Sequence, residues 1–257
     1  MATQSEKGHA KNLANLKLLK DIIFQAGQNY SPSNELLTYT LVDTLINQCS
    51  LDYDNWADKL IQFKYRSDER EIVFEKIDKL ATSINASVQQ LNVPQQTLND
   101  VQALVTKIHG TKAKIKKIPN NAPATTVTTV PELPVDPIST SQLSYDSIAS
   151  NFELLVKRLQ TIPPYAPNES ELQMQNLLAT VDLLRSLNLA AGSAANSLSL
   201  ARNQRNLSFY APQTGLYDVA KKIKNYLRSN PATANSAYKD AVKLNFVKIV
   251  QRKKKKA

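Results

Sequence analysis

The chain of 257 residues is poor in the residue types that make turn-rich folds and reactive centres. Its 5 glycines are too few for a turn-rich β fold and favour long helices with short connections. The single cysteine, Cys49, excludes a disulfide within the chain, has no candidate base at a readable spacing and is expected in the core. No long apolar run and no secretory signal occurs, so we predict a cytoplasmic protein without a membrane span.

The sequence also lacks the motifs that hold a phosphate, a metal or a nucleophile in enzymes. No Walker loop, GxGxxG, GxSxG or HExxH pattern is present. Of the two histidines, His9 and His109, only His9 follows a glutamate at Glu-x-x-His spacing, and a di-iron bundle needs two such motifs, so this class of site is excluded. Asp52, Asp54 and Asp58 have the spacing of a calcium loop without its glycine and closing glutamate, and helix capping explains the first two. We therefore predict no enzymatic activity, no metal and no cofactor.

A helical pattern that occurs twice, 135 positions apart, is the main feature that is present. Apolar residues recur in steps of four and three over 56–91, and the same positions plus 135 give a second, mostly apolar series over 191–226. Both series carry an arginine at the same inner point, Arg70 and Arg205. This pattern predicts one long-helix unit used twice, with the two long helices paired about a pseudo-two-fold axis.

Each copy divides into four predicted helices. In the first copy the helices cover about 11–28, 33–51, 54–91 and 94–110, with the second starting at Ser33 and a bend at 51–54 before the third. In the second copy they cover about 143–162, 169–188, 190–229 and 233–250. The turns between the first two helices each start with a tyrosine, Tyr30 or Tyr165, which we expect to pack over the corner. Pro212 lies inside the last long helix, so we expect a kink near 211–215.

The predicted fold class is all-α, an elongated antiparallel helical bundle made of two related four-helix units, each with one long helix. We divide the chain into helical repeat 1 at 1–110, a Pro/Thr-rich linker with a basic run at 111–141, helical repeat 2 at 142–251 and a lysine-rich tail at 252–257. Five prolines prevent a helix in the linker, which is therefore expected to be extended.

The net charge of +10 is concentrated in two short runs. Nine positive charges lie in these runs, and the rest of the chain is close to neutral, which argues against a broad nucleic-acid-binding face. Weak, salt-sensitive contact with RNA, DNA or anionic lipid is expected through the runs instead. The candidate residues are Lys112, Lys114, Lys116, Lys117, Arg252, Lys253, Lys254, Lys255 and Lys256.

The arginines inside the apolar pattern are the other candidate site, because a buried charge is costly unless it is paired. In one interpretation Arg70 and Arg205, with Arg66 and Arg202, face each other near the pseudo-two-fold axis and bind an anion or the carboxylates of a partner. In the other, they lie where the pattern reaches the surface and are solvated or paired with the acidic residues of 68–71.

Several segments along nearly the whole chain carry a resemblance. They are QSEKGHAKNLANL, STSQLSYDSIASNFELL, PYAPNESEL, ARNQRNLSFY, TGLYDVAKKIKNYLRS and AYKDAVKLNFVK. In these segments the chain resembles a family of uncharacterised duplicated helical proteins from Bacteroidota, most specifically in Tyr-x-Pro-Asn-Glu and Thr-Gly-Leu-Tyr-Asp-Val. The family has no assigned activity, so the resemblance implies no catalytic or binding residue.

Three functions are compatible with the sequence, and none of them is enzymatic. The first is a helical scaffold or adaptor that presents its long helices to a protein partner. The second is a polyanion-associated protein of the ribosome or nucleoid that acts through the basic runs. The third is a membrane-active, pore-forming-like helical protein, which needs a concealed apolar hairpin; the only candidate for it is Leu187–Leu200.

Overall fold

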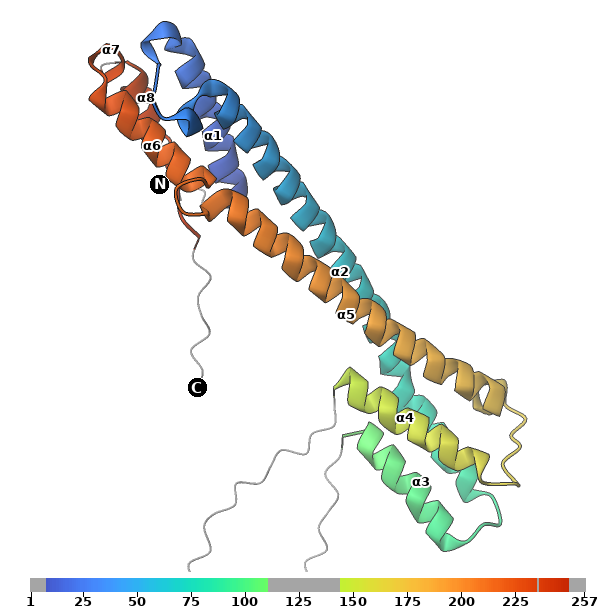
Figure 1. Ribbon diagram of the computed structural model, residues 1–257. Helices are drawn as coiled ribbons and strands as arrows, with labels where there is room; N and C mark the ends of the chain where they lie inside the picture. Colours follow the sequence, from blue (N-terminus) through green and yellow to red (C-terminus); the bar gives the residue numbers. More distant parts are fainter. Residues whose placement is uncertain (1–7, 111–143, 235, 250–257) are drawn as a thin grey trace, which may run out of the picture. The chain divides into compact units, whose positions relative to one another are not determined.

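The computed structural model describes residues 8–110, 144–234 and 236–249, and the described residues form helices and turns without a strand (Figure 1). The α-helices are α1 (His9–Gln25), α2 (Tyr39–Gln89), α3 (Gln95–Ile108), α4 (Tyr145–Gln160), α5 (Met174–Tyr210), α6 (Leu216–Ser229), α7 (Pro231–Ala234) and α8 (Ala237–Lys243). Three 3-10 turns, η1 (Gly27–Asn29), η2 (Glu35–Leu37) and η3 (Ser170–Leu172), complete the elements. The predicted all-α class is confirmed for these ranges. The predicted linker at 111–141 and the tail at 252–257 lie outside them.

The long helices are more continuous than the sequence pattern predicted. α2 runs without interruption for 51 residues, so the bend predicted at 51–54 is wrong. α5 likewise passes through the boundary predicted between 188 and 190. Asp52, expected to cap a helix, is instead a buried residue inside α2 that accepts a hydrogen bond from Gln48 at 3.1 Å. An aspartate inside a helix costs only about 0.7 kcal/mol relative to alanine, which packing readily outweighs.

The two tyrosine turns are corners, as predicted. The Tyr30 hydroxyl donates a hydrogen bond to the Leu37 carbonyl at 2.7 Å, and the Tyr165 hydroxyl donates to the Leu172 carbonyl at 3.0 Å. In both turns a 3-10 turn follows the tyrosine, so α2 and α5 begin several residues later than the sequence predicted. Cys49 is also placed as predicted, fully buried in the core.

Between α5 and α6 the helix breaks completely where a kink was predicted. Pro212 has no N–H to continue the helical hydrogen bonds, and the break begins just before it. Gly215 closes the turn, since its N–H donates to the Ala211 carbonyl at 2.9 Å. A Cβ atom on Gly215 would lie 2.6 Å from the Ala211 nitrogen, so the turn requires glycine at this position.

The chain forms two compact units, and the division falls within α2 and within α5. Residues 1–65 with 193–257 make the terminal unit, and residues 66–192 make the central unit. Each unit therefore combines described helices from before residue 111 with described helices from after residue 143. Each predicted repeat is one continuous stretch of sequence, whereas each compact unit combines residues from both predicted repeats.

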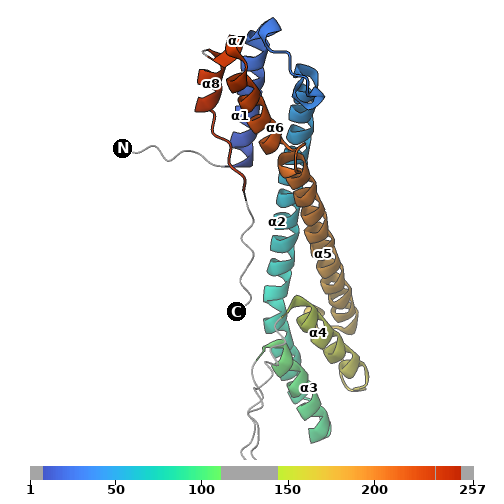
Figure 2. The same ribbon diagram turned by 60° about the vertical axis from the view of Figure 1, so that its left-hand side comes forward.

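The terminal unit has its own hydrophobic core, to which α1, α2, the end of α5, α6 and α8 contribute. Figure 2 shows α1 beside α6 and α8, in agreement with the contacts among these helices. Its buried residues are Leu13, Leu16, Leu19, Ile23, Leu37, Val42, Ile46, Cys49, Phe209, Leu216, Val219, Ala220, Ile223, Leu227 and Ala241.

The central unit is built from the second part of α2, α3, α4 and the first part of α5. α3 and α4 pack against each other, and Phe152 and Leu155 on α4 are completely buried. Within the ranges that the structure describes, no helix has the length and apolarity needed to cross a bilayer. The segment Leu187–Leu200 lies inside the single helix α5, so it is not the hairpin that a pore-forming function would need.

Candidate functional site

α6 presents an apolar face to the core and a basic face to solvent. Its buried positions recur with helical spacing, and each of them is at most 1% exposed: Leu216, Val219, Ala220, Ile223 and Leu227. The opposite side carries Lys221, Lys222, Lys224 and Arg228. The short α8 adds Lys239 and Lys243, and Lys248 follows it. These seven residues define the α6–α8 basic surface.

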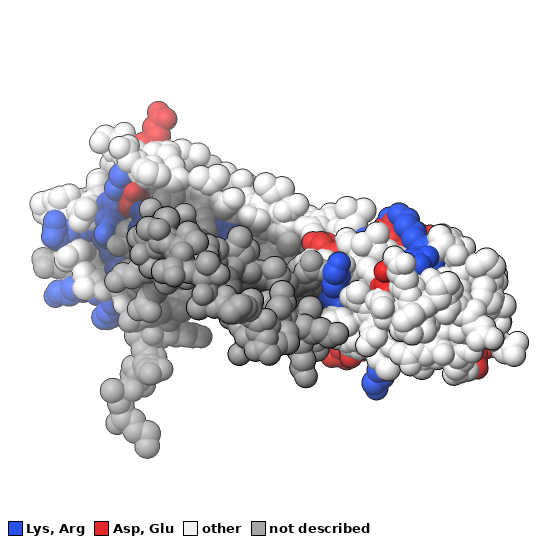
Figure 3. Space-filling model, turned by 90° about the horizontal axis from the view of Figure 1, so that it is seen from below, with Lys and Arg blue, Asp and Glu red and all other residues white. Residues whose placement is uncertain are grey.

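The basic surface has few acidic neighbours along the chain. Between 216 and 249 only Asp218 and Asp240 oppose the seven positive charges, which leaves a net charge of +5. Figure 3 shows lysine and arginine side chains on the left of the view, in the region where α1, α6, α7 and α8 lie in Figure 1. The net charge of the chain outside the two basic runs is close to zero, so this sum did not reveal the surface. A count of charged residues restricted to 216–249 reveals it.

Most of these cations have no carboxylate partner among the described residues. Lys243 pairs with Asp240 at 2.8 Å, whereas Lys222 donates to the Gln213 carbonyl at 3.1 Å and Lys224 donates to the Leu244 carbonyl. Lys221 lies over the Tyr217 ring, 4.4 Å from its centre. Unpaired positive charges that gather on one surface produce the field that attracts polyanions.

In the central unit a larger share of the basic residues is paired with carboxylates. Four of its eight described lysines and arginines form ion pairs with nearby carboxylates: Arg66–Glu69 at 2.8 Å, Lys157–Glu153 at 2.6 Å, Arg158–Asp100 at 3.2 Å and Arg185–Glu153 at 2.5 Å. Paired surface charges contribute little to stability and little to the long-range field. The net charge of +5 over 216–249, with a single ion pair among its seven cations, therefore identifies the α6–α8 basic surface as the candidate polyanion-binding site.

A pocket of about 390 Å³ opens within this surface, lined by Lys221, Lys224, Asn225, Tyr238 and Val242. Burial lowers the pKa of Lys224, whose Nζ also lies 5.2 Å from the centre of the Phe246 ring. The pocket therefore combines fixed positive charge with an aromatic ring and an exposed apolar side chain.

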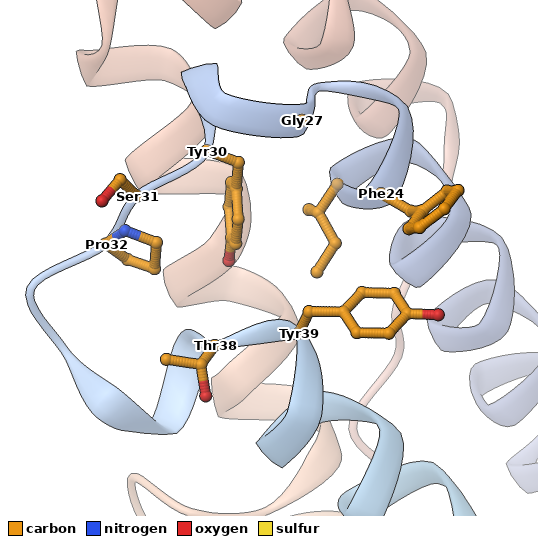
Figure 4. A pocket seen from close by; sticks show the side chains of 8 residues that line it. Phe24, Gly27, Tyr30, Ser31, Pro32, Thr38 and Tyr39 are labelled. Atoms are coloured by element: carbon orange, nitrogen blue, oxygen red, sulfur yellow. The ribbon is translucent and has the colours of Figure 1, made fainter.

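A second pocket, of about 470 Å³, lies between the end of α1 and the start of α2 (Figure 4), and its lining residues are Ile23, Phe24, Gly27, Tyr30, Ser31, Pro32, Thr38 and Tyr39. Gly27, one of these lining residues, is 135 positions before Ile162. The Tyr30 N–H donates to the Gly27 carbonyl at 3.0 Å, and the Tyr165 N–H makes the same bond to Ile162, whose side chain is buried. The lining carries no charged side chain, so this pocket does not extend the basic surface.

The predicted arginine site divides between the two units. Arg205 lies over the Trp56 ring in the terminal unit, 4.3 Å from its centre, and Arg70 lies over the Tyr145 ring in the central unit, at 3.9 Å. Neither of these two arginines forms an ion pair with a carboxylate in the described ranges, so the predicted pairing with 68–71 is found for Arg66, which pairs with Glu69, and not for Arg70 or Arg205.

Arg205 is deeply buried and lies in a polar cluster. It is 5% exposed, and burial lowers its pKa, with a smaller contribution from the charge of Arg202. Its Nε, the His9 Nε2 and the Trp56 Nε1 have no hydrogen-bond partner among the described residues. Burial, followed by the charge of Arg205, lowers the pKa of His9 to about 4. At this burial Arg205 does not reach a macromolecular partner, and anion binding by Arg70, Arg202 and Arg205 stays a prediction.

The predicted basic runs at 112–117 and 252–256 lie outside the described residues, so the structure assigns them no position. Comparisons with known proteins give no match: no protein-family model, no curated protein and no solved structure matches this chain. The resemblance to Bacteroidota proteins stays a prediction, and function is argued from geometry and charge alone.

Proposed function

We propose that this protein is a non-enzymatic, cytoplasmic helical protein that binds nucleic acid through the α6–α8 basic surface. The observation that carries this proposal is the accumulation of seven cations between 216 and 249, only one of which, Lys243, has a carboxylate partner among the described residues. Such cations bind phosphates and release condensed counterions, which gives affinity that depends strongly on salt.

The packing of α6 favours nucleic acid over a lipid surface. An amphipathic helix that binds a membrane inserts its apolar face beside the lysines. The apolar face of α6 is already used, because Val219, Ile223 and Leu227 are at most 1% exposed in the core. The side that remains is polar and basic, with Tyr217 and Tyr238 among the lysines. Basic residues that alternate with aromatic ones are typical of single-stranded nucleic-acid binding.

A charge-matched pair of variants tests the proposal. The surface variant changes four exposed cations without an ion pair to glutamine: Lys221, Arg228, Lys239 and Lys248. The control variant makes the same change at four exposed cations of the central unit: Lys76, Lys79, Lys107 and Lys157. Fluorescence anisotropy with a labelled 12-nucleotide strand measures the dissociation constant of each protein.

The surface variant is expected to bind about tenfold or more weakly than the wild type, and the control variant nearly as well as the wild type, because local phosphate contacts determine the affinity. Equal losses in both variants would mean that overall charge alone attracts the strand, and the proposal would then be wrong. Circular dichroism of both variants shows whether the helices are retained.

We also propose that the two helical repeats predicted from the sequence are structurally related and exchange helices. The 3-10 turns η2 and η3 and the starts of α2 and α5 are each 135 positions apart. His9 of repeat 1 packs against Phe209 of repeat 2 at 5.3 Å, and Tyr145 of repeat 2 packs against Phe74 of repeat 1 at 4.8 Å, between ring centres. Each repeat's first helix would thus complete the core formed with the other repeat's long helix.

A scaffold or adaptor function is a second candidate, supported by exposed apolar side chains at matching positions. Ile72 and Leu207 are 135 positions apart and are 57% and 58% exposed. Exposed apolar side chains of this kind suit contact with a protein partner. Cross-linking in native cytoplasm tests this function with a variant in which Ile72 and Leu207 are both changed to lysine. The variant should lose a cross-linked protein partner and retain nucleic-acid binding, and a partner that remains cross-linked would argue against this function.

A further inference from the structure

We propose that the pocket between α6 and α8 holds one unpaired nucleotide of a single strand, with the base against Tyr238 and Val242 and the phosphate at Lys221 and Asn225. This inference rests on the proposed function and adds the class of nucleic acid: single strands in preference to duplexes. Its experiment separates failure of the pocket from failure of nucleic-acid binding as a whole.

The helical spacing of the lining residues brings the polar groups together. Lys221, Lys224 and Asn225 are three and four positions apart on α6, so their side chains share one face. Tyr238 and Val242 are four apart on α8 and form the apolar part of the lining. The volume of about 390 Å³ falls in the range of about 300–1,000 Å³ that is usual for small-ligand sites.

The charges at the pocket are held in place. The Lys224 ammonium donates to the Leu244 carbonyl and is half-buried, and the Lys221 ammonium rests over the Tyr217 ring at 4.4 Å. A cation that is already positioned loses less conformational entropy on meeting a phosphate than a freely moving surface lysine does. Asn225 is exposed at the same rim and supplies amide N–H donors for a phosphate oxygen.

The apolar part of the lining indicates a base in addition to a phosphate. Val242 is an apolar side chain that is 52% exposed within the basic surface. A phosphate alone would not need an apolar contact at this position. Tyr238 offers a half-buried ring beside it. Every base has a flat face that stacks on an aromatic ring, and in a duplex these faces are covered by neighbouring bases. The pocket therefore suits an unpaired base.

Three labelled 12-nucleotide ligands separate stacking from charge: an oligothymidine strand, an abasic strand with the same phosphates, and a duplex. Fluorescence anisotropy at one salt concentration measures their dissociation constants for the full chain. The wild type should bind oligothymidine about tenfold or more tightly than the abasic strand, since stacking of one base contributes about 1–3 kcal/mol. Tyr238→Leu should remove this difference and leave abasic binding unchanged, whereas Tyr238→Phe should retain it.

Two further variants test whether the effect is specific to the pocket between α6 and α8. Tyr39→Leu changes an exposed tyrosine in the other pocket and should behave as the wild type does. Val242→Glu places a carboxylate at an exposed position of the pocket and should weaken binding of oligothymidine more than tenfold, even where Tyr238→Leu proves unstable.

Each result has a defined meaning. Equal wild-type affinities for the abasic strand and oligothymidine, or full affinity in Val242→Glu, would overturn the pocket and leave the proposed function in place. Binding of vesicles with anionic lipid, with no binding of any of the three ligands, would overturn both. Loss of the single-strand preference in Tyr238→Leu alone supports the proposal.

Discussion

The guanidinium of Arg205 lies 4.3 Å from the centre of the Trp56 ring, and this ring, not a carboxylate, faces the buried charge. A desolvated cation–π contact contributes about 2 kcal/mol, whereas burying a charge costs several kcal/mol. The contact offsets only part of this cost, so we expect Arg205→Met to leave the free energy of unfolding unchanged or to raise it by about 1 kcal/mol.

Trp56→Leu is the informative counterpart, because it removes the ring and leaves the charge buried. We expect it to lower the free energy of unfolding by about 3 kcal/mol. Urea unfolding followed by circular dichroism measures both variants. A larger loss in Arg205→Met than in Trp56→Leu would contradict this account of the buried arginine.

His9 next to Arg205 predicts a loss of stability in acid. Burial, followed by the charge of Arg205, lowers its pKa in the folded chain to about 4, against about 6.5 for an unfolded histidine. The unfolded chain therefore takes up this proton first as the pH falls. The stability that neutral His9 contributes is complete above pH 6.5 and is lost between about pH 6.5 and 4.

The expected loss from His9 is about 2 kcal/mol, because the partly exposed ring is worth less than the full shift. Urea unfolding at pH 7, 5.5 and 4 measures it, with His9→Gln as the control that lacks the titrating ring. Arg205→Met should reduce the loss, since the repelling charge is gone. An identical pH dependence in the wild type and His9→Gln would rule out this assignment.

Local features were predictable from the sequence wherever one residue type decides the backbone. Pro212 indicated the interruption after α5 because proline cannot donate the helical hydrogen bond. Tyr30 and Tyr165 indicated corners because each precedes a proline turn. The predicted bend at 51–54 was wrong because aspartates only weakly oppose a helix, and tertiary packing continues α2 through them.

The candidate site was harder to predict because it depends on pairing across space. Lys157 and Arg158 have carboxylate partners, one of which, Asp100, is 58 positions away in the sequence, while Lys221 has none in the described part of the chain. The sequence shows only the number of charges. Which of them remain unpaired is decided by how α3, α4, α6 and α8 pack.

Two glycines should respond to alanine in opposite directions. At Gly215 a Cβ would lie 2.6 Å from the Ala211 nitrogen, so Gly215→Ala should lower the free energy of unfolding by about 2 kcal/mol. At Gly192, within α5, nothing lies within 4 Å of an added Cβ, so Gly192→Ala should raise it by about 0.5–1 kcal/mol. Urea unfolding compares them, and a Gly215→Ala variant as stable as the wild type would show that the α5–α6 turn does not require glycine.

Cutting the chain between the predicted repeats should leave the two fragments together. Each compact unit contains helices from both sides of 111–143, including α1 with α6 and α3 with α4. A protease site inserted within that segment allows cleavage of the folded protein. Co-elution of the fragments on size exclusion without denaturant, and separation in urea, is the expected result. Fragments that separate in native buffer would contradict the division into these units.

The salt dependence of single-strand binding tests the central claim, that the α6–α8 basic surface contacts phosphates, most directly. Each phosphate contact contributes about −0.7 to the slope of log K against log salt concentration. The four substitutions at 221, 228, 239 and 248 should therefore reduce the magnitude of the slope by about 3. The same reduction is expected when these substitutions are made in a chain whose basic residues at 112–117 and 252–256 have already been changed to glutamine. An unchanged slope in the surface variant would contradict the account.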